Sequence, residues 1–473
     1  MHDITIIGAG PGGYAAAFDA ARRGASVTLV EKAELGGTCL NSGCIPTKTI
    51  KASADALETA GGLAEFGLVS NDGAHSASFR ADMPSIVARK ERVCKILRGG
   101  LEKTCTGLKI KLLHGQAELA PDRKVLVYTG QGVEKLCADA VIIATGSKIM
   151  TLPSLSIDHR YIIDSDDALH LEQLPTRMLI AGGGVIGCEL AFIFRAFGVK
   201  VTVVEGLNRL LPLPSIDEEV SRLLQREAKK RGIRVELARI VKSAELSGSK
   251  VACILSASPF VESAGGQEEV IETDVVLVTV GRSSNTAGLK LKEAGVATDR
   301  QGWIMADGWM RTSADGVYAI GDALGPARAM LAHVASFEGE CAVANCFGRE
   351  ERLDYSVIPS GIFTSPEIGT VGLSEAEAKK QGMAVRSSLF QFRELGKAHA
   401  MGELPGLFKL VCEESSGRIL GAHIAGAHAT DIIAEAALAM KSSLSVAQLA
   451  NTMHAHPTLA EGLYEAAKAW LRG

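Results

Sequence analysis

The sequence predicts an α/β fold in which two copies of one strand–turn–helix–strand unit precede a C-terminal α+β region. Residues 2–32 and 177–205 align with each other without a gap. Apolar runs that end in glycine recur along the chain, as the buried strands of parallel sheets do. Glycine supplies 51 of the 473 residues without a G-X-Y period, which indicates many tight turns.

Composition excludes several classes of protein. Apolar residues make up 47% and charged residues 22%, which is ordinary globular usage, and the length predicts about three domains. The net charge of −4 without a basic block gives no support for a nucleic-acid partner. No apolar run is long enough to insert into a membrane, and a strand at 4–7 leaves no room for a signal peptide. Ten cysteines are too few for a disulfide scaffold, so we expect a cytoplasmic protein with reduced thiols.

Each copy of the repeat carries the spacing G-x-G-x-x-G between its first strand and its helix. Glycines that permit a tight turn, a close approach to a pyrophosphate and close helix packing have this spacing in dinucleotide-binding units. An acidic residue follows the third glycine by 18 positions, where it can bind a ribose. The repeat therefore predicts two Rossmann-like dinucleotide sites. The first contains Gly8, Gly10, Gly13 and Glu31, and the second contains Gly182, Gly184, Val185, Ile186, Gly187 and Glu205.

Three further apolar runs fit the same architecture, at 140–147, 275–282 and 317–323. They end at Thr145–Gly146, Gly281 and Asp322, and we expect the Asp322 carboxylate to bind a cofactor hydroxyl. After about residue 350 the pattern changes. Strand-like alternation occurs at 359–369 and 407–422, and helical patterns occur at 431–441, 446–451 and 458–471.

A cysteine pair lies just beyond the first acidic strand end, in the segment LGGTCLNSGCIPTK. In an ideal helix the Cα atoms of Cys39 and Cys44 would be about 8–9 Å apart, too far for a disulfide. The surrounding glycines and Pro46 predict an irregular turn that closes this gap, so we interpret the pair as redox-active. Cys341 and Cys346 have the same spacing in a regular helical pattern, and we interpret them as structural. No metal site is predicted, because no second ligand pair stands nearby.

Two dinucleotides beside a dithiol define a chemical task. A nicotinamide transfers hydride, whereas a thiolate exchanges with disulfides. A flavin can react with both partners, so the first unit should bind FAD and the second a nicotinamide dinucleotide. Glu205 favours NAD, because a carboxylate would repel the 2′-phosphate of NADP. Arg209 could bind such a phosphate, but we expect it to be a surface residue.

The motifs GGTCLNSGCIPTK, GGGVIGCELA, AIGDA followed by MLAH, and HAHPTLAEGLYEA resemble those of the pyridine nucleotide–disulfide oxidoreductases. Within that family the resemblance is greatest to the dihydrolipoamide dehydrogenases, and it covers essentially the whole chain. It implies a homodimer with four parts. These are an FAD domain (1–148), an NAD domain (149–274), a segment returning to the FAD domain (275–348) and a dimerisation domain (349–473).

The resemblance also implies roles for individual residues. Cys39 would meet the substrate, Cys44 would lie next to the flavin, and Lys48 would pair with Glu189 near it. His456 would be the acid–base partner of Cys39, oriented by Glu461, although Thr458 and Glu461 also have the spacing of a helix capping box. The role of His454 stays open. The further FAD contacts implied are Gly37, Thr38, Ala117, Leu331, Ala332 and His333.

The implied reaction is oxidation of dihydrolipoamide on a lipoyl-bearing protein, either the E2 component of a 2-oxoacid dehydrogenase complex or a glycine cleavage H-type protein. An alternative is an NADH-dependent reductase of another small disulfide. A different class is a non-catalytic dinucleotide-binding assembly protein. Joint retention of the cysteines, Lys48, Glu189, His456 and Glu461 argues against that class.

Overall fold

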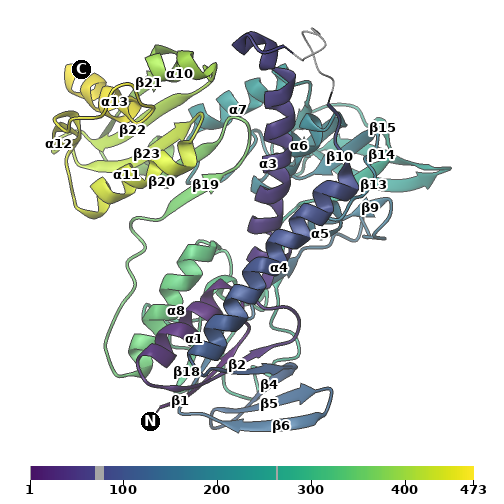
Figure 1. Ribbon diagram of the computed structural model, residues 1–473, viewed down its shortest axis with the longest axis vertical. Coiled ribbons are helices and arrows are strands. Elements are labelled where there is room, and N and C mark those ends of the chain that lie inside the picture. The colour runs from purple at the N-terminus through teal and green to yellow at the C-terminus, as the bar shows by residue number, and fades with distance from the viewer. Residues whose placement is uncertain (1, 70–78, 263–264) are drawn as a thin grey trace. The chain divides into compact units, whose positions relative to one another are not determined.

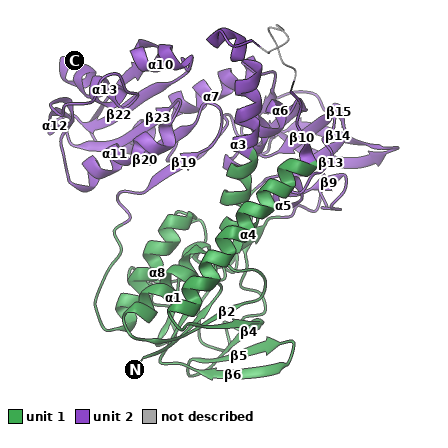
Figure 2. Ribbon diagram, viewed as in Figure 1, with its two compact units in different colours: residues 1–50, 84–150, 281–354 green, residues 51–83, 151–280, 355–473 purple. Residues whose placement is uncertain are grey.

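The computed structural model describes residues 2–69, 79–262 and 265–473. Two compact units make up the chain (Figure 2). Unit 1 contains Met1–Ile50, Pro84–Met150 and Gly281–Asp354, and unit 2 contains Lys51–Met83, Thr151–Val280 and Tyr355–Gly473. Each unit is therefore assembled from three separate stretches of chain. No helix in the described part of the chain has the length and apolar character needed to cross a bilayer.

Unit 1 is built on a five-stranded parallel sheet in the order β18–β7–β1–β2–β3. Its strands are β1 (Asp3–Ile7), β2 (Ser26–Glu31), β3 (Lys111–His114), β7 (Ala140–Ile143) and β18 (Val317–Ala319). This order is that of a mononucleotide-binding half in a doubly wound sheet, with the first strand at the centre. The carboxyl end of β1 therefore faces the position at which such sheets bind ligands.

Helices α1 (Pro11–Arg22) and α8 (Ala332–Cys346) lie against each other in unit 1 (Figure 1). Their contact needs glycine on both sides. A Cβ on Gly339 would lie 2.7 Å from the carbonyl oxygen of Gly12, and one on Gly12 would lie 2.9 Å from that of Ala335. Two helices belong partly to each unit, α3 (Cys44–Gly61) and α4 (Met83–Gly107). The remaining elements of unit 1 include two antiparallel sheets, β4–β5–β6 and β8–β17. They are α2 (Gly37–Asn41), β4 (Gln116–Ala120), β5 (Lys124–Thr129), β6 (Gly132–Cys137), β8 (Ser147–Ile149), β17 (Arg282–Ser284) and η2 (Gly321–Leu324).

Unit 2 repeats the parallel arrangement in a sheet of order β12–β11–β10–β16–β9. Its strands are β9 (Ile162–Ile163), β10 (Arg177–Ala181), β11 (Lys200–Glu205), β12 (Arg234–Leu237) and β16 (Val275–Val278). The helices of this part are α5 (Ser165–Ala168), α6 (Val185–Ala196) and α7 (Glu218–Lys230). A three-stranded antiparallel sheet follows β12, formed by β13 (Arg239–Ser247), β14 (Lys250–Ala257) and β15 (Glu269–Thr273).

The C-terminal part of unit 2 is an antiparallel sheet of order β19–β20–β23–β22–β21. Its strands are β19 (Pro359–Ile362), β20 (Ile368–Gly372), β21 (Val385–Gln391), β22 (Leu407–Glu413) and β23 (Ile419–Ala425). Its helices are η3 (Phe392–Glu394), α9 (Glu375–Lys380), α10 (Gly396–Met401), α11 (Ala429–Lys441), α12 (Val446–Ala450) and α13 (Glu461–Arg472). The short helix η1 (Leu63–Phe66) also belongs to unit 2. In the core, Phe392 stacks on Phe408 with ring centroids 4.6 Å apart.

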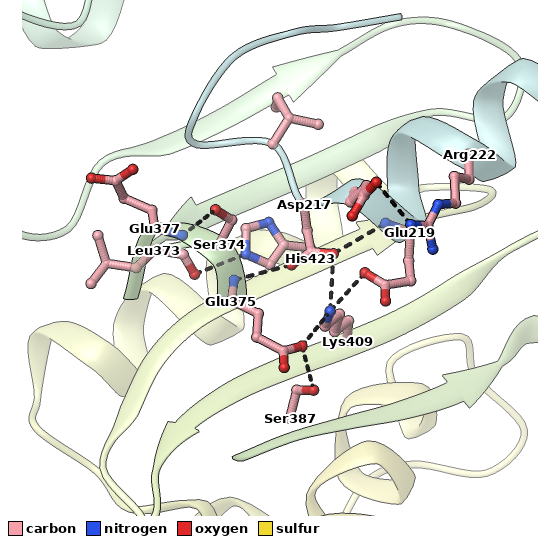
Figure 3. Close-up of polar contacts among 12 residues, drawn as sticks. Asp217, Glu219, Arg222, Leu373, Ser374, Glu375, Glu377, Ser387, Lys409 and His423 are labelled. Atoms are coloured by element: carbon pink, nitrogen blue, oxygen red, sulfur yellow. Dashed lines mark hydrogen bonds and ion pairs between the residues drawn. The ribbon is translucent and has the colours of Figure 1, made fainter. Parts of the chain in front are cut away.

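A buried ion network joins the two parts of unit 2 (Figure 3). The Lys409 ammonium on β22, only 3% exposed, lies 3.0 Å from Asp217, 2.7 Å from Glu219 and 2.8 Å from Glu375. Asp217 is the N-cap of α7, and Glu375 begins α9. Burial acts to lower the pKa of Lys409, but the three carboxylates raise it. The network therefore stays charged and ties the nucleotide-binding part of unit 2 to the C-terminal sheet.

The predicted fold class is confirmed, with two Rossmann-like parts and a C-terminal α+β part. Several elements are shorter than the ranges predicted for them. In the runs at 140–147 and 275–282 only the first four residues join the parallel sheet, because the glycine-containing turn leaves it, and the last residue of each run begins β8 or β17. The last helix begins at Glu461 rather than 458. The Thr458 hydroxyl donates to Ala455 instead of capping the helix, so the capping box is formed only in part.

Candidate active site

The glycine turn after β1 has the close contacts that its spacing predicts. Gly8 has φ +104°, and a Cβ there would lie 2.3 Å from the carbonyl oxygen of Ala144. A Cβ on Gly13 would lie 1.8 Å from the carbonyl oxygen of Gly8, so only glycine lets α1 approach the strand this closely. The turn leads directly into the N-terminus of α1, where free N–H groups can bind a pyrophosphate.

The turn after β10 repeats these contacts. Gly182 has φ +109°, and its Cβ would lie 2.5 Å from the carbonyl oxygen of Thr279. A Cβ on Gly187 would lie 2.0 Å from the carbonyl oxygen of Gly182. Among the described residues, nothing lies within 4 Å of a Cβ built on Gly184, so its backbone is open to a ligand. Val185 and Ile186 form the first turn of α6.

The acidic residue of each repeat bridges two backbone segments. Glu31 accepts hydrogen bonds from the amides of Ala9 (2.7 Å) and Ala33 (2.9 Å). Glu205, 7% exposed, accepts from Gly183 (2.6 Å) and Leu207 (2.8 Å). A carboxylate has about four acceptor positions, so each can still bind a ribose hydroxyl. Both side chains therefore also fix the glycine turn that precedes them.

Arg209 is hydrogen-bonded within its own loop. Its guanidinium donates to the carbonyl oxygens of Ile216 (3.0 Å) and Leu213 (2.8 Å) in its own loop. Its side chain is half-buried, because these bonds hold it against the loop. The carboxylate of Glu205 remains the predicted ribose ligand at the end of β11.

The cysteine pair lies across a break between two helices. Cys39 lies in α2 and Cys44 begins α3, with Ser42 and Gly43 outside both helices. A Cβ on Gly43 would lie 2.9 Å from the carbonyl oxygen of Thr38, so glycine permits the break. The predicted irregular turn is therefore present, whereas Cys341 lies within the regular helix α8 and Cys346 ends it.

The segment that carries Cys39 and Cys44 is attached to the first glycine turn. The amide of Gly36 donates to the carbonyl oxygen of Ala9 at 2.9 Å. A Cβ on Gly37 would lie 2.7 Å from the Cα of Gly10. Gly10 belongs to the turn that would hold the FAD pyrophosphate. The backbone just before Cys39 therefore contacts this turn directly.

The side chains of the two cysteines are in hydrogen-bond contact with each other. That contact and burial raise the pKa of Cys39, and the nearby Lys48 ammonium opposes the rise. Tyr14 is a neighbour that the sequence did not reveal. The pKa of Tyr14 is raised mainly by burial and further by the two cysteines. Tyr14 follows Gly13 directly, so only its position in the glycine motif could have suggested it.

Asp322 is held in place by two side chains that sequence reasoning missed. The Ser147 hydroxyl donates to its carboxylate at 2.6 Å, and the Arg282 guanidinium lies 3.9 Å away and also bonds Ser147. Leu331 is the N-cap of α8, and Ala332 and His333 form its first turn. Asp322 and this helix N-terminus thus belong to the same unit as the first glycine turn.

The remaining predicted FAD contacts also lie in unit 1. Ala117 is on β4, beside Gly115, whose amide donates to the carbonyl oxygen of Glu31. Among the described residues, the buried Thr145 hydroxyl has no hydrogen-bond partner, as expected of a group that binds a ligand. Gly281, predicted as a cofactor contact without assignment to either dinucleotide, precedes β17 with φ +131°. The residues of unit 1 therefore fit an FAD.

The His456–Glu461 pair forms in unit 2. Nδ1 of His456 lies 2.9 Å from Glu461, whose other oxygen accepts from the Thr458 amide at 2.8 Å. His456 keeps 77% of its side chain exposed, so Nε2 can meet a substrate. Glu189 is also in unit 2, buried, and accepts from the Phe363 amide at 2.9 Å. Its pairing with Lys48 of unit 1 stays a prediction.

His159, Asp164 and Asp167 bring three potential ligand atoms within 4.8 Å of one another. Asp164 and Asp167 form the capping box of α5, and His159 bonds Asp167. These groups therefore already have a local structural role.

Comparison with known proteins agrees with this geometry. Residues 2–339 match the model of the pyridine nucleotide-disulphide oxidoreductases, and 358–467 match the dimerisation domain of the same group. The chain is 39% identical to the dihydrolipoyl dehydrogenase of Chlamydia muridarum, covering 98% of this chain and 96% of that protein. It is 36% identical to the leghemoglobin reductase of Glycine max, covering 99% and 87%. The crystal structure of LpdA from Mycobacterium tuberculosis superimposes with TM-score 0.89 at 26% identity over 99% of each chain.

Proposed function

The chain belongs to the pyridine nucleotide-disulphide oxidoreductase family, and from this premise we propose that it is a dihydrolipoyl dehydrogenase. It oxidises dihydrolipoamide to lipoamide and reduces NAD⁺, using FAD and the pair Cys39–Cys44. The observation that carries the proposal is the attachment of the cysteine segment to the first dinucleotide turn, through Gly36–Ala9 and Gly37–Gly10. A dithiol fixed beside a flavin site is suited to exchange electrons between a disulfide and a nicotinamide.

The glycine turn and acidic strand end of each unit assign the two cofactors. Unit 1 would hold FAD through Gly8, Gly10, Gly13, Glu31, Thr145 and Asp322, and unit 2 would hold NAD through Gly182, Gly184, Gly187 and Glu205. When bound, FAD supplies the chemistry that links thiolates to hydride transfer. Glu205 supports NAD over NADP, since its carboxylate is fixed by two backbone amides and repels a 2′-phosphate.

Different side chains would carry out the separate steps of the thiol–disulfide exchange. His456 removes a proton from a dihydrolipoamide thiol, and Glu461 keeps its imidazole in one orientation. The resulting thiolate attacks Cys39 of the disulfide, and Cys44 leaves as a thiolate. The second substrate thiol then displaces Cys39, which leaves lipoamide and two reduced cysteines. Two electrons pass onward to NAD⁺, and one proton is released. The Lys48 ammonium acts to lower the pKa of Cys39, which supports its proposed role of stabilising a thiolate of this pair.

We propose a homodimer whose substrate is the lipoyl group of an E2 or H-type protein, in the cytoplasm. The dimerisation-domain match at 358–467 supports a pair of chains. His456 would then serve the Cys39 of the other chain, as the family resemblance implies. An NADH-dependent reductase of another small disulfide remains the alternative. One relative that matches nearly the whole chain is named for a different reductase activity, so the substrate needs a direct test.

A direct experiment is to measure NAD⁺ reduction by dihydrolipoamide with the purified holoenzyme. Wild type should turn over, and Cys39→Ser and Cys44→Ser should lose activity. Cys341→Ser is the matched control. It has a partner at the same spacing, but burial raises its pKa to about 11 and it lies within α8. Its activity should equal that of wild type. Turnover with another disulfide and NADH, but not with dihydrolipoamide, would support the alternative.

A further inference from the structure

A second histidine–glutamate pair lies next to the proposed acid–base pair. Nδ1 of His454 lies 2.9 Å from the carbonyl oxygen of Thr452, and Nε2 lies 2.7 Å from Glu435 on α11. The His454 side chain is only 6% exposed. The motif HAHPTLAE alone does not separate the roles of its two histidines.

Both ring nitrogens of His454 have a partner. A carbonyl oxygen only accepts hydrogen bonds, so Nδ1 donates to Thr452. Nε2 faces the Glu435 carboxylate, which keeps 34% of its side chain in solvent. His454 is thus held between its own turn and α11.

The charged and titratable groups around His454 come from two helices. Glu435 faces it from α11. Helix α13 contributes Glu461 and Tyr464, whose ring centroid is 5.5 Å from the imidazole and has the Lys468 ammonium above it. Burial acts to raise the pKa of Glu461, but the Thr458 amide, His456 and the charge of His454 lower it. His454 thus acts on the carboxylate that orients His456.

We propose that Glu435 and His454 are positioning residues for the His456–Glu461 pair. Their ion pair fixes the turn before His456 to α11 and places a positive charge beside the Glu461 carboxylate. This rests on the proposed function, in which His456 exchanges protons with the substrate thiols. The segment between α12 and α13 contains no helix or strand, so its catalytic side chain needs such an anchor.

The test compares Glu435→Gln and His454→Gln with wild type in the holoenzyme. In Glu435→Gln the amide can donate to Nε2, so a neutral imidazole keeps its contact but loses its charge. With less positive charge nearby, His456 holds its proton more tightly. The acidic limb of the pH–rate profile for dihydrolipoamide oxidation should therefore move to higher pH in both variants. In His454→Gln the kcat should also fall about tenfold, as when a reacting group is slightly misplaced.

Two controls separate this role from general damage. His428→Asn removes another histidine near an acid, Asp431 at 3.8 Å, from the start of the same helix. Asparagine tolerates the φ of +57° there, and kinetics should be unchanged. The KM for NAD⁺, and NADH oxidation by ferricyanide, which does not need the thiol base, should be unchanged in every variant.

The outcomes are distinct. Unaltered kcat and an unaltered pH profile in both Glu435→Gln and His454→Gln would overturn this inference alone. A wild-type enzyme that fails to oxidise dihydrolipoamide would overturn the proposed function, and this inference with it. Equal losses in the ferricyanide reaction would show a structural defect rather than positioning, and would also contradict the proposal.

Discussion

Glu31 and Glu205 make the same two hydrogen bonds at equivalent places in the two repeats. Each accepts from the amide of the residue after the first motif glycine, Ala9 or Gly183, and from the residue two positions beyond itself, Ala33 or Leu207. The carboxylate therefore joins the end of the second strand to the glycine turn of the first. Both glutamates do this before any ribose binds, so the nucleotide meets an acceptor that is already in place.

Glu205→Gln should weaken NAD⁺ binding, because an amide cannot accept from both backbone N–H groups with two oxygens. A hydrogen bond to a charged group contributes about 1.5–3 kcal/mol, so Kd should rise roughly 10-fold to 150-fold. Calorimetric titration with NAD⁺ measures this directly. Glu31→Gln is the matched control, and it should lower FAD retention and leave NAD⁺ affinity unchanged. Efficient use of NADPH by the unmodified enzyme would contradict the role assigned to Glu205.

Gly339→Ala should destabilise unit 1, because the added Cβ would lie 2.7 Å from the carbonyl oxygen of Gly12 and 3.2 Å from Ala16. Overpacking of this kind costs about 1–3 kcal/mol. We expect a lower apparent Tm and loss of FAD during gel filtration, measured by absorbance. Gly100→Ala in α4 meets no described atom within 4 Å and should raise the Tm slightly. An FAD content equal to wild type in Gly339→Ala would show that the α1–α8 contact does not support the cofactor.

The buried His423 should make the fold sensitive to mild acid. Burial lowers its pKa, and its Nε2 lies 3.0 Å from the carbonyl oxygen of Leu373. As pH falls below the ordinary histidine value of about 6.5, the unfolded chain binds a proton that the folded chain does not. Stability attributable to His423 is therefore present above that pH and is lost below it. His423→Gln should show a smaller fall in apparent Tm between pH 7 and 5 than wild type.

His159→Gln supplies a control of opposite sign. Its hydrogen bond with Asp167 raises the pKa of His159, so its stabilisation is present at low pH and is lost as pH rises. This variant should lose at least as much Tm in acid as wild type. Parallel Tm–pH curves for wild type and His423→Gln would rule out the role of His423.

Subunit mixing tests whether the proposed active site is shared between chains. Cys39→Ser and His456→Ala dimers should each be poorly active. After dissociation and remixing, half the dimers are mixed, and each contains one intact site if Cys39 works with His456 of the other chain. About one quarter of wild-type activity should then return. No recovery, with subunit exchange shown by mass spectrometry, would place each site within one chain.

The parts of the site that could be predicted are those imposed by local backbone geometry. The G-x-G-x-x-G turns, the break between Cys39 and Cys44 and the acidic strand ends all follow from residues close together in sequence. The Ser147–Asp322 hydrogen bond, between residues 175 positions apart, has no such signature. The same is true of Lys409, whose partner Asp217 is 192 positions away. Tyr14 looked like an ordinary residue of α1, because its neighbours Cys39 and Cys44 come from two other helices.

The contact between Gly12 and Gly339 has a consequence for biosynthesis. Unit 1 begins at the first residue, yet its helix α8 and strand β18 come from Gly281–Asp354. The whole stretch Thr151–Val280, with the second glycine turn and its sheet, is translated in between. Chains are made from the N-terminus, so the proposed FAD site of unit 1 is completed only after the proposed NAD site within Thr151–Val280 has been translated. FAD should therefore bind late in translation, after Gly281–Asp354 has been made, whereas the proposed NAD site is encoded in one uninterrupted stretch.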